Sequence, residues 1–148
     1  MSDKKRILIV EDDEDIGMVE EAYLEAAGFD TFIVSDGTKV SALLQKESFD
    51  LVLLDLMLPG KSGYEVCREI RDMVDIPILM VTARTESIDK ILGLGMGADD
   101  YIGKPFDPTE LVERVLANIR QHDRLLRKLP EENTQEMRIA DLRIFVNS

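Results

Sequence analysis

Five side chains able to do chemistry stand directly or shortly after short apolar runs: Glu11, Asp12, Asp55, Thr82 and Lys104. If the apolar runs are parallel strands, these side chains meet at the carboxyl edge of one sheet, where open α/β sheets bind ligands. Two carboxylates about 4 Å apart repel by ~4 kcal/mol at an effective dielectric near 20, so the acids need a cation or a shared proton. Hard oxygen ligands at a cramped site suit Mg²⁺, which prefers a phosphate as a further ligand.

Asp55 is the acid that a structural role explains least, because it ends a run of four apolar residues. Lys104 is its natural counter-charge and could next pair with a phosphoryl oxygen, and Pro105 restricts the backbone of that lysine. Thr82 could donate a hydrogen bond to the same oxygen, or equally serve as a cap or loop hydroxyl. Residues 13–15 are predicted to form a solvated acidic turn in which Asp15 caps the following helix.

Apolar runs alternate with segments of helical period along most of the chain. The runs that predict strands are 7–10, 31–34, 51–54, 78–81 and, more weakly, 100–102. The first helix is expected to bury one stripe and to end at Gly28; the stripe is Ile16, Val19, Tyr23, Leu24 and Ala27. The last helix is expected to begin at Pro108. Apolar strands alternating with helices indicate an α/β fold, a parallel sheet covered on both faces.

Composition excludes several classes of function. Of the 148 residues, 30 are acidic and 18 basic, and the net charge of −12 disfavours binding to nucleic acid or anionic lipid. The single cysteine, Cys67, can form no internal disulfide and is predicted to pack in the core. The run 7–10 is too short for a membrane span, so a cytoplasmic protein is expected. His122, the only histidine, is predicted to be solvated.

Four strings of the sequence resemble one family closely. ILIVEDDEDI, FDLVLLDLMLPGKSGYEV, IPILMVTAR and GADDYIGKPFDPTELVERV are similar to the receiver domain of bacterial two-component response regulators, more narrowly the OmpR/PhoB type. The resemblance covers roughly residues 4–124. It implies a flavodoxin-like, doubly wound, five-stranded parallel sheet with helices on both faces.

The resemblance also implies a role for each acidic residue. Asp55 matches the aspartate that accepts a phosphoryl group from a sensor histidine kinase. Glu11 and Asp12 match the family's acidic pair, and the backbone carbonyl of Met57 matches its third protein ligand for Mg²⁺. By this resemblance the chain is not an enzyme. It is a phospho-acceptor that assists its own phosphorylation and dephosphorylation.

Three further positions match the family's switch. Thr82 matches the switch hydroxyl and Tyr101 the switch aromatic. Lys104 matches the lysine before a usually cis proline, here Pro105. The resemblance implies that phosphorylation at the site biases a surface formed by the fourth helix, the fifth strand and the last helix.

The same resemblance implies a symmetric homodimer in the phosphorylated state. The expected pairs across the two-fold axis are Lys90–Glu110 and Asp100–Arg114. Glu110 and Arg114 are four residues apart and therefore share one helix face.

The predicted domain organisation is a receiver domain at 1–124, a linker at 125–136 and the start of a truncated winged-helix effector domain at 137–148. The OmpR/PhoB type continues into such a domain to control transcription, whereas here no recognition helix follows. We therefore expect a truncated or naturally shortened chain that reaches DNA only through the missing effector domain.

Two other functions share part of this residue pattern. An aspartate-nucleophile, Mg²⁺-dependent phosphatase of the haloacid-dehalogenase type uses similar residues, but it normally wants a general acid two residues after the nucleophile, where this chain has Met57. A flavodoxin-like FMN module needs a phosphate-binding loop after the first strand, and the acids from Glu11 to Asp15 would repel the phosphate.

Overall fold

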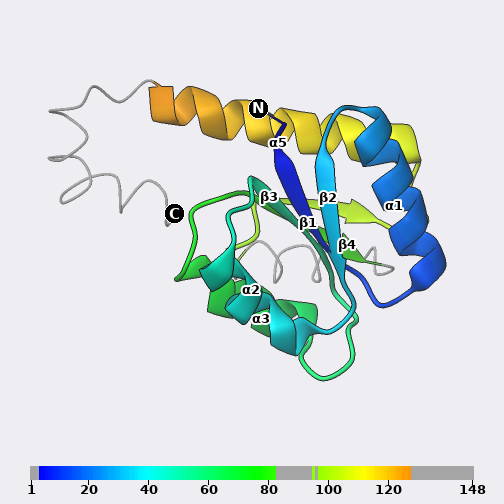
Figure 1. The fold of residues 1–148 in the computed structure, drawn as a ribbon, viewed down its shortest axis with the longest axis vertical. Helices are drawn as coiled ribbons and strands as arrows, with labels where there is room; N and C mark the ends of the chain where they lie inside the picture. Colours follow the sequence, from blue (N-terminus) through cyan, green and yellow to red (C-terminus); the bar gives the residue numbers. More distant parts are fainter. Residues whose placement is uncertain (1–3, 83–94, 96, 128–148) are drawn as a thin grey trace, which may run out of the picture.

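The computed structural model describes residues 4–82, 95 and 97–127. Five parallel strands form one sheet in the order β2-β1-β3-β4-β5. Their bounds are β1 Arg6–Val10, β2 Asp30–Val34, β3 Leu51–Asp55, β4 Ile78–Thr82 and β5 Asp100–Gly103. The predicted α/β fold, with a five-stranded parallel sheet and helices on both faces, is confirmed (Figure 1).

The described helices cover both faces of this sheet (Figure 1). They are α1 Glu14–Ala26, the short 3₁₀ helix η1 Gly37–Lys39, α2 Val40–Lys46, α3 Gly63–Arg71 and α5 Pro108–Arg127. Alternate residues of the central strands enter the two layers: Leu8 and Val52 pack with α2 and α3, whereas Ile9 and Leu53 pack with the layer that α5 completes. This two-sided burial explains why the strands are apolar throughout. Cys67 is fully buried in the α2–α3 layer, as predicted.

Helix α1 buries Leu24 as predicted, but most of the predicted stripe is not buried. Val19 and Tyr23 are 40% and 47% exposed, whereas the buried residues of the helix are Gly17, Glu20 and Leu24. The predicted stripe followed the apolar residues, but the inner face carries a glycine and an acid. The predicted cap is also wrong: the Asp13 side chain, not that of Asp15, accepts from the backbone N–H groups that begin the helix. The predicted end is confirmed, because Gly28 follows the last turn with a φ of +101°.

Helix α5 begins at Pro108 as predicted and continues to Arg127, into the range assigned to the linker. His122 on this helix is not solvated as predicted: its side chain is 25% exposed, and its Nε2 lies 3.7 Å from Oδ2 of Asp75. The predicted fourth helix with Lys90, and residues 128–148, lie outside the described residues. Within the described ranges, no helix has the length and apolar character that crossing a bilayer requires.

Candidate functional site

The carboxyl edge of the sheet gathers the predicted site residues. Asp55 ends β3 and is 4% exposed, and Thr82 ends β4 and is 1% exposed. Glu11 follows β1 directly and is 3% exposed. Because β1 pairs with β3 and β3 pairs with β4 in parallel register, these ends lie side by side. The edge therefore buries two carboxyl groups and one hydroxyl close together.

Lys104 joins the two buried acids. Its Nζ lies 3.3 Å from Oδ1 of Asp55 and 3.2 Å from Oε1 of Glu11. The Lys104 backbone N–H donates to the carbonyl of Thr82 at 2.6 Å, and the Lys104–Pro105 peptide bond is cis, as the resemblance implied. The predicted pairing of Lys104 with Asp55 is thus present, although ion pairing with Glu11 was not foreseen.

The electrostatics of this group follow from its burial. Burial is the largest cause that raises the pKa of Asp55, the Glu11 carboxylate raises it further, and Lys104 acts against both. Burial alone would lower the pKa of Lys104, but the neighbouring Asp55 and Glu11 carboxylates outweigh it and raise this pKa. Lys104 therefore remains a cation, and a further positive charge would stabilise ionised Asp55.

Three carboxylates at this edge could hold a metal ion. Glu11, Asp12 and Asp55 each offer an oxygen, and these oxygens lie within 4.8 Å of one another. When all three are ionised, the one ammonium group of Lys104 compensates only one of the three negative charges. An oxygen-only donor set with this charge fits a hard divalent cation such as Mg²⁺.

The loop after Asp55 is held by backbone contacts. The Met57 N–H donates to Oδ1 of Asp55 at 3.4 Å, and the Gly63 N–H donates to the Leu56 carbonyl at 2.8 Å. A Cβ atom at Gly63 would collide with the backbone of Asp55 and Leu56, so only glycine allows α3 to begin this close. The Ser62 capping box fixes the same helix end. Residue 57 thus lies beside Asp55, and its carbonyl as a metal ligand stays a prediction.

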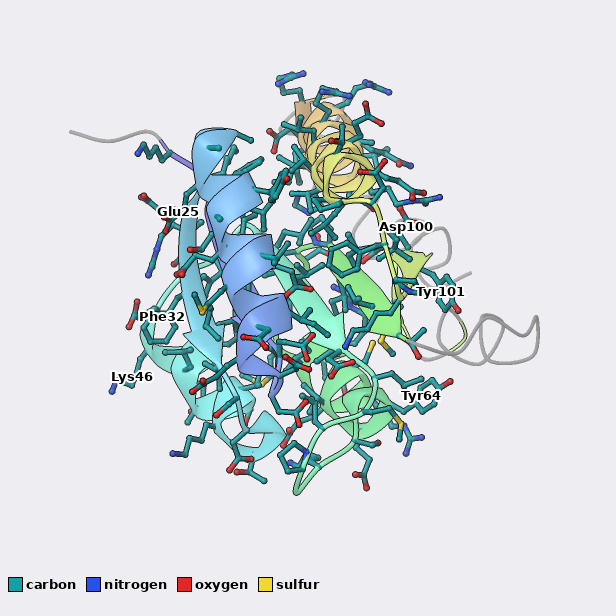
Figure 2. All side chains as sticks on the ribbon, turned by 90° about the vertical axis from the view of Figure 1, so that its right-hand side faces the viewer. Glu25, Phe32, Lys46, Tyr64, Asp100 and Tyr101 are labelled. Atoms are coloured by element: carbon teal, nitrogen blue, oxygen red, sulfur yellow. The ribbon has the colours of Figure 1, made fainter. Side chains whose placement is uncertain are left out.

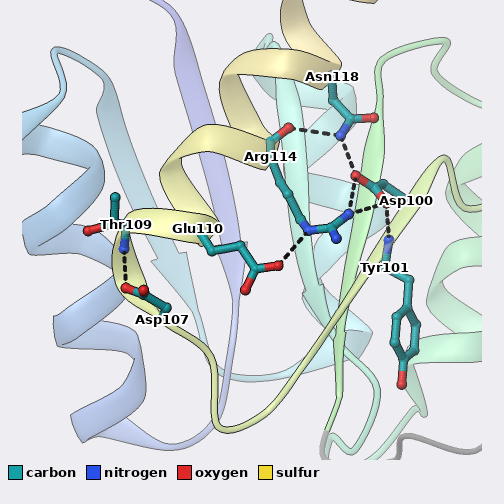
Figure 3. Close-up of polar contacts among 7 residues, drawn as sticks. All are labelled: Asp100, Tyr101, Asp107, Thr109, Glu110, Arg114 and Asn118. Atoms are coloured by element: carbon teal, nitrogen blue, oxygen red, sulfur yellow. Dashed lines mark hydrogen bonds and ion pairs between the residues drawn. The ribbon is translucent and has the colours of Figure 1, made fainter.

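The predicted switch residues lie on the neighbouring strands. Tyr101 is half-buried on β5, next to Asp100 along this edge strand (Figure 2). Its backbone N–H donates to Oδ1 of Asp100 at 2.8 Å, and its ring extends away from the Asp100–Arg114 contact (Figure 3). Thr82 pairs in register with Gly103, directly before Lys104. The structure therefore brings Thr82 to the acidic site and Tyr101 to the adjoining strand.

Comparisons with known proteins show the family of this chain. Residues 7–116 match the model of the response regulator receiver domain. The chain belongs to the response regulator receiver domain family. It is 45% identical over 143 residues to the DNA-binding response regulator MtrA of Mycobacterium tuberculosis, and equally to that of Mycolicibacterium paratuberculosis. The match covers 97% of this chain and 60% of each relative, so the chain spans about three fifths of their length.

Solved receiver domains share the fold. The BeF3-activated N-terminal receiver domain of Klebsiella pneumoniae RstA has a TM-score of 0.75 and 38% identity, over 78% of this chain and 99% of that chain. A CheY-like response regulator receiver domain from Methanospirillum hungatei has a TM-score of 0.77 and 30% identity, over 82% and 98%. A receiver domain is a signalling module, in agreement with the prediction that the chain is no ordinary enzyme.

Sequence reasoning missed one acid of this receiver domain. Glu20, on the inner face of α1, is 1% exposed. Its pKa is raised to about 8: burial is the largest cause, the charges of Glu11 and Asp55 act in the same direction, and Lys104 acts against them. The spacing of Gly17, Glu20 and Leu24 was the available signal, because positions three and four residues apart share a helix face. Glu20 was passed over because it is not apolar.

An apolar groove adjoins the site. It lies between the first turns of α1 and the segment from Lys104 to Pro108, and it is lined by Asp15, Ile16, Val19, Lys104, Pro105, Phe106 and Pro108. Lys104 borders both the groove and the acidic cluster. A partner seated in the groove would therefore be next to Asp55.

Metal binding can be tested on the unphosphorylated chain. Mg²⁺ should raise the melting temperature of the wild type, since it binds only the folded acidic site. Asp12→Ala should remove this rise, because Asp12 is the exposed member of the cluster and its loss leaves the buried pair intact. Thermal unfolding with and without Mg²⁺ measures the effect, and Asp15→Ala, an exposed acid of the same turn, is the control. A rise of the same size in Asp12→Ala would place the ion elsewhere, for example at residues 13–15.

Proposed function

We propose that this receiver domain accepts a phosphoryl group on Asp55 from a phosphohistidine of a sensor histidine kinase. The observation that carries the proposal is the contact of buried Asp55 with Lys104 inside a cluster of three acids. An Asp55 oxygen forms a bond to phosphorus while the bond from phosphorus to the histidine nitrogen breaks, and that electron pair returns to the histidine ring. The product is an acyl phosphate.

The other site residues stabilise this transfer. Glu11, Asp12, Asp55 and the Met57 carbonyl would hold Mg²⁺, which neutralises charge on the phosphoryl oxygens when bound. Lys104 is already within 3.3 Å of Asp55 and pairs with a phosphoryl oxygen once the acyl phosphate forms. Thr82 donates its hydroxyl to another oxygen. In this way the domain assists its own phosphorylation and dephosphorylation.

Phosphorylation then acts on the edge of the sheet. The phosphoryl group brings about two negative charges and three acceptor oxygens to a site that already contains carboxylates. Thr82 moves toward it, and Tyr101 follows on the adjoining strand. This shift biases the surface of which β5 and α5 are the described part.

Control of transcription is the proposed output of the whole regulator. The relatives named MtrA are DNA-binding response regulators, and the acidic chain described here has no charge pattern suited to DNA. We assign DNA contact to an effector domain, with residues 1–124 as receiver, 125–136 as linker and 137–148 as the start of that domain. A cytoplasmic location suits this function.

Met57 favours an acceptor over a turnover phosphatase. It stands two residues after Asp55, and its side chain is 60% exposed beside the site. A thioether cannot donate the proton that a phosphatase supplies to its leaving group. The chain therefore lacks, at this position, the proton donor that turnover of phosphate esters requires, which favours the role of a phospho-acceptor.

Incubation with Mg²⁺ and acetyl phosphate tests the proposal. Intact mass spectrometry should detect one phosphoryl adduct, and hydroxylamine should remove it because it cleaves acyl phosphates. Omission of Mg²⁺ is the control and should strongly slow the reaction. An adduct that survives hydroxylamine would be a phosphoester and would contradict phosphorylation of a carboxylate.

In the proposed dimer, Arg114 would have to share or exchange the ion pairs that it already makes within its own chain. Its Nη1 lies 3.0 Å from Oδ1 of Asp100 and its Nε 3.2 Å from Oε2 of Glu110, while Asn118 also donates to Asp100 (Figure 3). The predicted pairs Lys90–Glu110 and Asp100–Arg114 across the two-fold axis would share or exchange these contacts. The intersubunit pairs remain proposals.

Arg114→Glu should prevent dimerisation induced by beryllofluoride and Mg²⁺. Exposed pairs contribute ~0.2–1 kcal/mol each, and reversal at two symmetric sites replaces attraction by repulsion, so dimer affinity should fall roughly tenfold or more. Sedimentation with and without the phosphoryl mimic measures it, and Arg120→Glu on the same helix is the matched control. If Arg114→Glu dimerises as well as wild type, the proposed face is wrong.

A further inference from the structure

The end of β2 and the turn after it (residues 35–38) contact two segments that carry proposed Mg²⁺ ligands. The Val34 carbonyl accepts a hydrogen bond from the backbone N–H of Glu11 at 3.0 Å, which connects β2 to the acidic segment. Residues of the turn also pack against the loop 58–61, which directly follows Met57. No residue of the turn belongs to the acidic cluster, so its role at the site is one of support.

Gly37 makes the closest of these contacts. It is buried, and a Cβ atom there would lie 2.7 Å from the carbonyl oxygen of Lys61 and 2.9 Å from Cγ2 of Val66. Nonbonded carbon atoms pack at ~3.5–4 Å, so any side chain at this position would force the turn and the loop apart. Glycine thus allows the turn after β2 to rest directly on the backbone of the loop.

A second contact joins the turn and the loop beside the first. Gly60 has a φ of +78°, and a Cβ atom there would lie 3.2 Å from Cγ2 of Thr38 and 3.3 Å from Oδ1 of Asp36. The same Asp36 oxygen accepts hydrogen bonds from the backbone N–H of Thr38 at 2.9 Å and from its hydroxyl at 2.8 Å. These two bonds hold the shape of the turn, and the loop is packed against that shape.

The loop in turn determines where the Met57 carbonyl points. This carbonyl lies in one peptide plane with the nitrogen of Leu58, so a displacement of Leu58 reorients it. The Leu58 side chain is itself part of the contact, because its Cδ1 would lie 3.4 Å from a Cβ atom at Gly37. The Met57 N–H donates to Oδ1 of Asp55 at 3.4 Å, which is long for a hydrogen bond. That bond alone constrains residue 57 only weakly.

We infer that Gly37 is a positioning residue for the Met57 carbonyl, and that the contact it allows favours Mg²⁺ over a larger cation. Mg²⁺ demands near-ideal octahedral geometry with ligands at ~2.0–2.1 Å, whereas Ca²⁺ accepts irregular ligand sets at ~2.3–2.6 Å. A displaced carbonyl therefore weakens the binding of Mg²⁺ more than that of Ca²⁺. The inference rests on the proposed function, in which this carbonyl is a ligand of the metal ion.

Gly37→Ala tests the inference with every acid of the cluster left in place. Mg²⁺ and Ca²⁺ are titrated separately at one temperature, and the backbone amide resonances of Asp12 and Met57 report binding. Loss of a group that supports a metal ligand typically lowers metal affinity about 10–100-fold, and one ligand of several is affected here, so Mg²⁺ affinity should fall roughly tenfold. Ca²⁺ affinity should fall about threefold or less, because its coordination adapts.

A destabilised control separates positioning from folding. Val115→Ala removes buried volume from the layer that α5 completes, so it should lower the melting temperature. Its affinities for Mg²⁺ and Ca²⁺ should match those of the wild type. The ratio of the two affinities is therefore the readout that a general loss of stability does not change.

A second pair of variants loosens the turn without adding volume. Asp36→Ala and Asp36→Asn remove the same charge, but only asparagine keeps a side-chain oxygen that can accept from Thr38. Asp36→Ala should therefore have a lower Mg²⁺ to Ca²⁺ affinity ratio than Asp36→Asn. If Gly37→Ala does not fold cooperatively, this pair decides, and equal ratios in its two members overturn the inference.

The outcomes are separable from those of the proposed function. An unchanged Mg²⁺ affinity in Gly37→Ala overturns the inference, and so does an equal loss of Mg²⁺ and Ca²⁺ affinity. If the wild type shows neither Mg²⁺-dependent shifts at Asp12 nor an acyl phosphate on Asp55, the proposed function fails. If the wild type shows both and Gly37→Ala keeps its preference for Mg²⁺, only the role of Gly37 fails.

Discussion

Asp55→Asn should abolish the hydroxylamine-sensitive phosphoryl adduct that acetyl phosphate forms with the wild type. The amide oxygen carries no full negative charge and cannot form an acyl phosphate, so the loss should be complete. The fold should tolerate the change, because it removes one of three mutually repelling carboxylates from a buried edge. Intact mass spectrometry after incubation with Mg²⁺ and acetyl phosphate measures the result.

A matched control separates the site from general reactivity. Asp72→Asn makes the same chemical change at an exposed residue that follows α3, and it should be modified like the wild type. Thermal unfolding should place Asp55→Asn at or above the wild-type melting temperature. An unaltered adduct in Asp55→Asn would assign the phosphorylated residue elsewhere.

The second large effect concerns stability and its dependence on pH. Burial raises the pKa of Glu20 from 4.5 to about 8, with the charge of Glu11 as the next cause. Between these values the folded chain binds a proton that the unfolded chain has lost, so wild-type stability falls as pH rises through this window. The slope is about 1.4 kcal/mol per pH unit. Glu20→Gln removes the titration, and its advantage over wild type should grow with pH, to a few kcal/mol near pH 8.

Denaturant unfolding from pH 5 to pH 8 measures this difference, and Glu113→Gln, the same change at an exposed position on α5, is the control. The control should differ little from wild type at every pH. A Glu20→Gln advantage that stays constant across this range would mean that Glu20 is ionised already near pH 5. The structural account of its burial would then be wrong.

The central sheet could be predicted from the sequence because its strands are buried on both faces. Each of the runs 7–10, 51–54 and 78–81 is apolar throughout, which is typical of parallel strands with both faces buried. The strands could therefore be predicted without knowing which side chains point to which face of the sheet. The position of Asp55 and Lys104 followed from strand ends alone, and their contact is present in the structure.

Helices were less predictable where polar residues are buried. On α1 hydropathy predicted the burial of Leu24 correctly, but Val19 and Tyr23 are exposed and Glu20 is buried in their place. The cost of burying Glu20 depends on Glu11 and Lys104, which are distant in sequence, and no local pattern contains that information. His122 is a similar case, because its neighbour Asp75 comes from another part of the chain.

The contacts of Arg114 could be predicted from the sequence only in part. The spacing of Glu110 and Arg114 predicted a shared helix face, and the structure confirms their contact within α5. The sequence could not say that Asp100 would meet Arg114 within one chain, because that contact depends on how α5 packs beside β5. Whether the same residues also meet across a two-fold axis is decided by the sedimentation experiment above.

Reductive mapping of the modified residue tests the central claim most directly. After reaction with acetyl phosphate and Mg²⁺, borohydride reduces an aspartyl phosphate to homoserine, and peptide mass spectrometry locates the change. We predict homoserine at position 55 alone, in the peptide that contains residues 51–56, and none without acetyl phosphate. Homoserine at Asp12 or Asp13 with Asp55 intact, or no reducible residue in a phosphorylated chain, would contradict phosphorylation of Asp55.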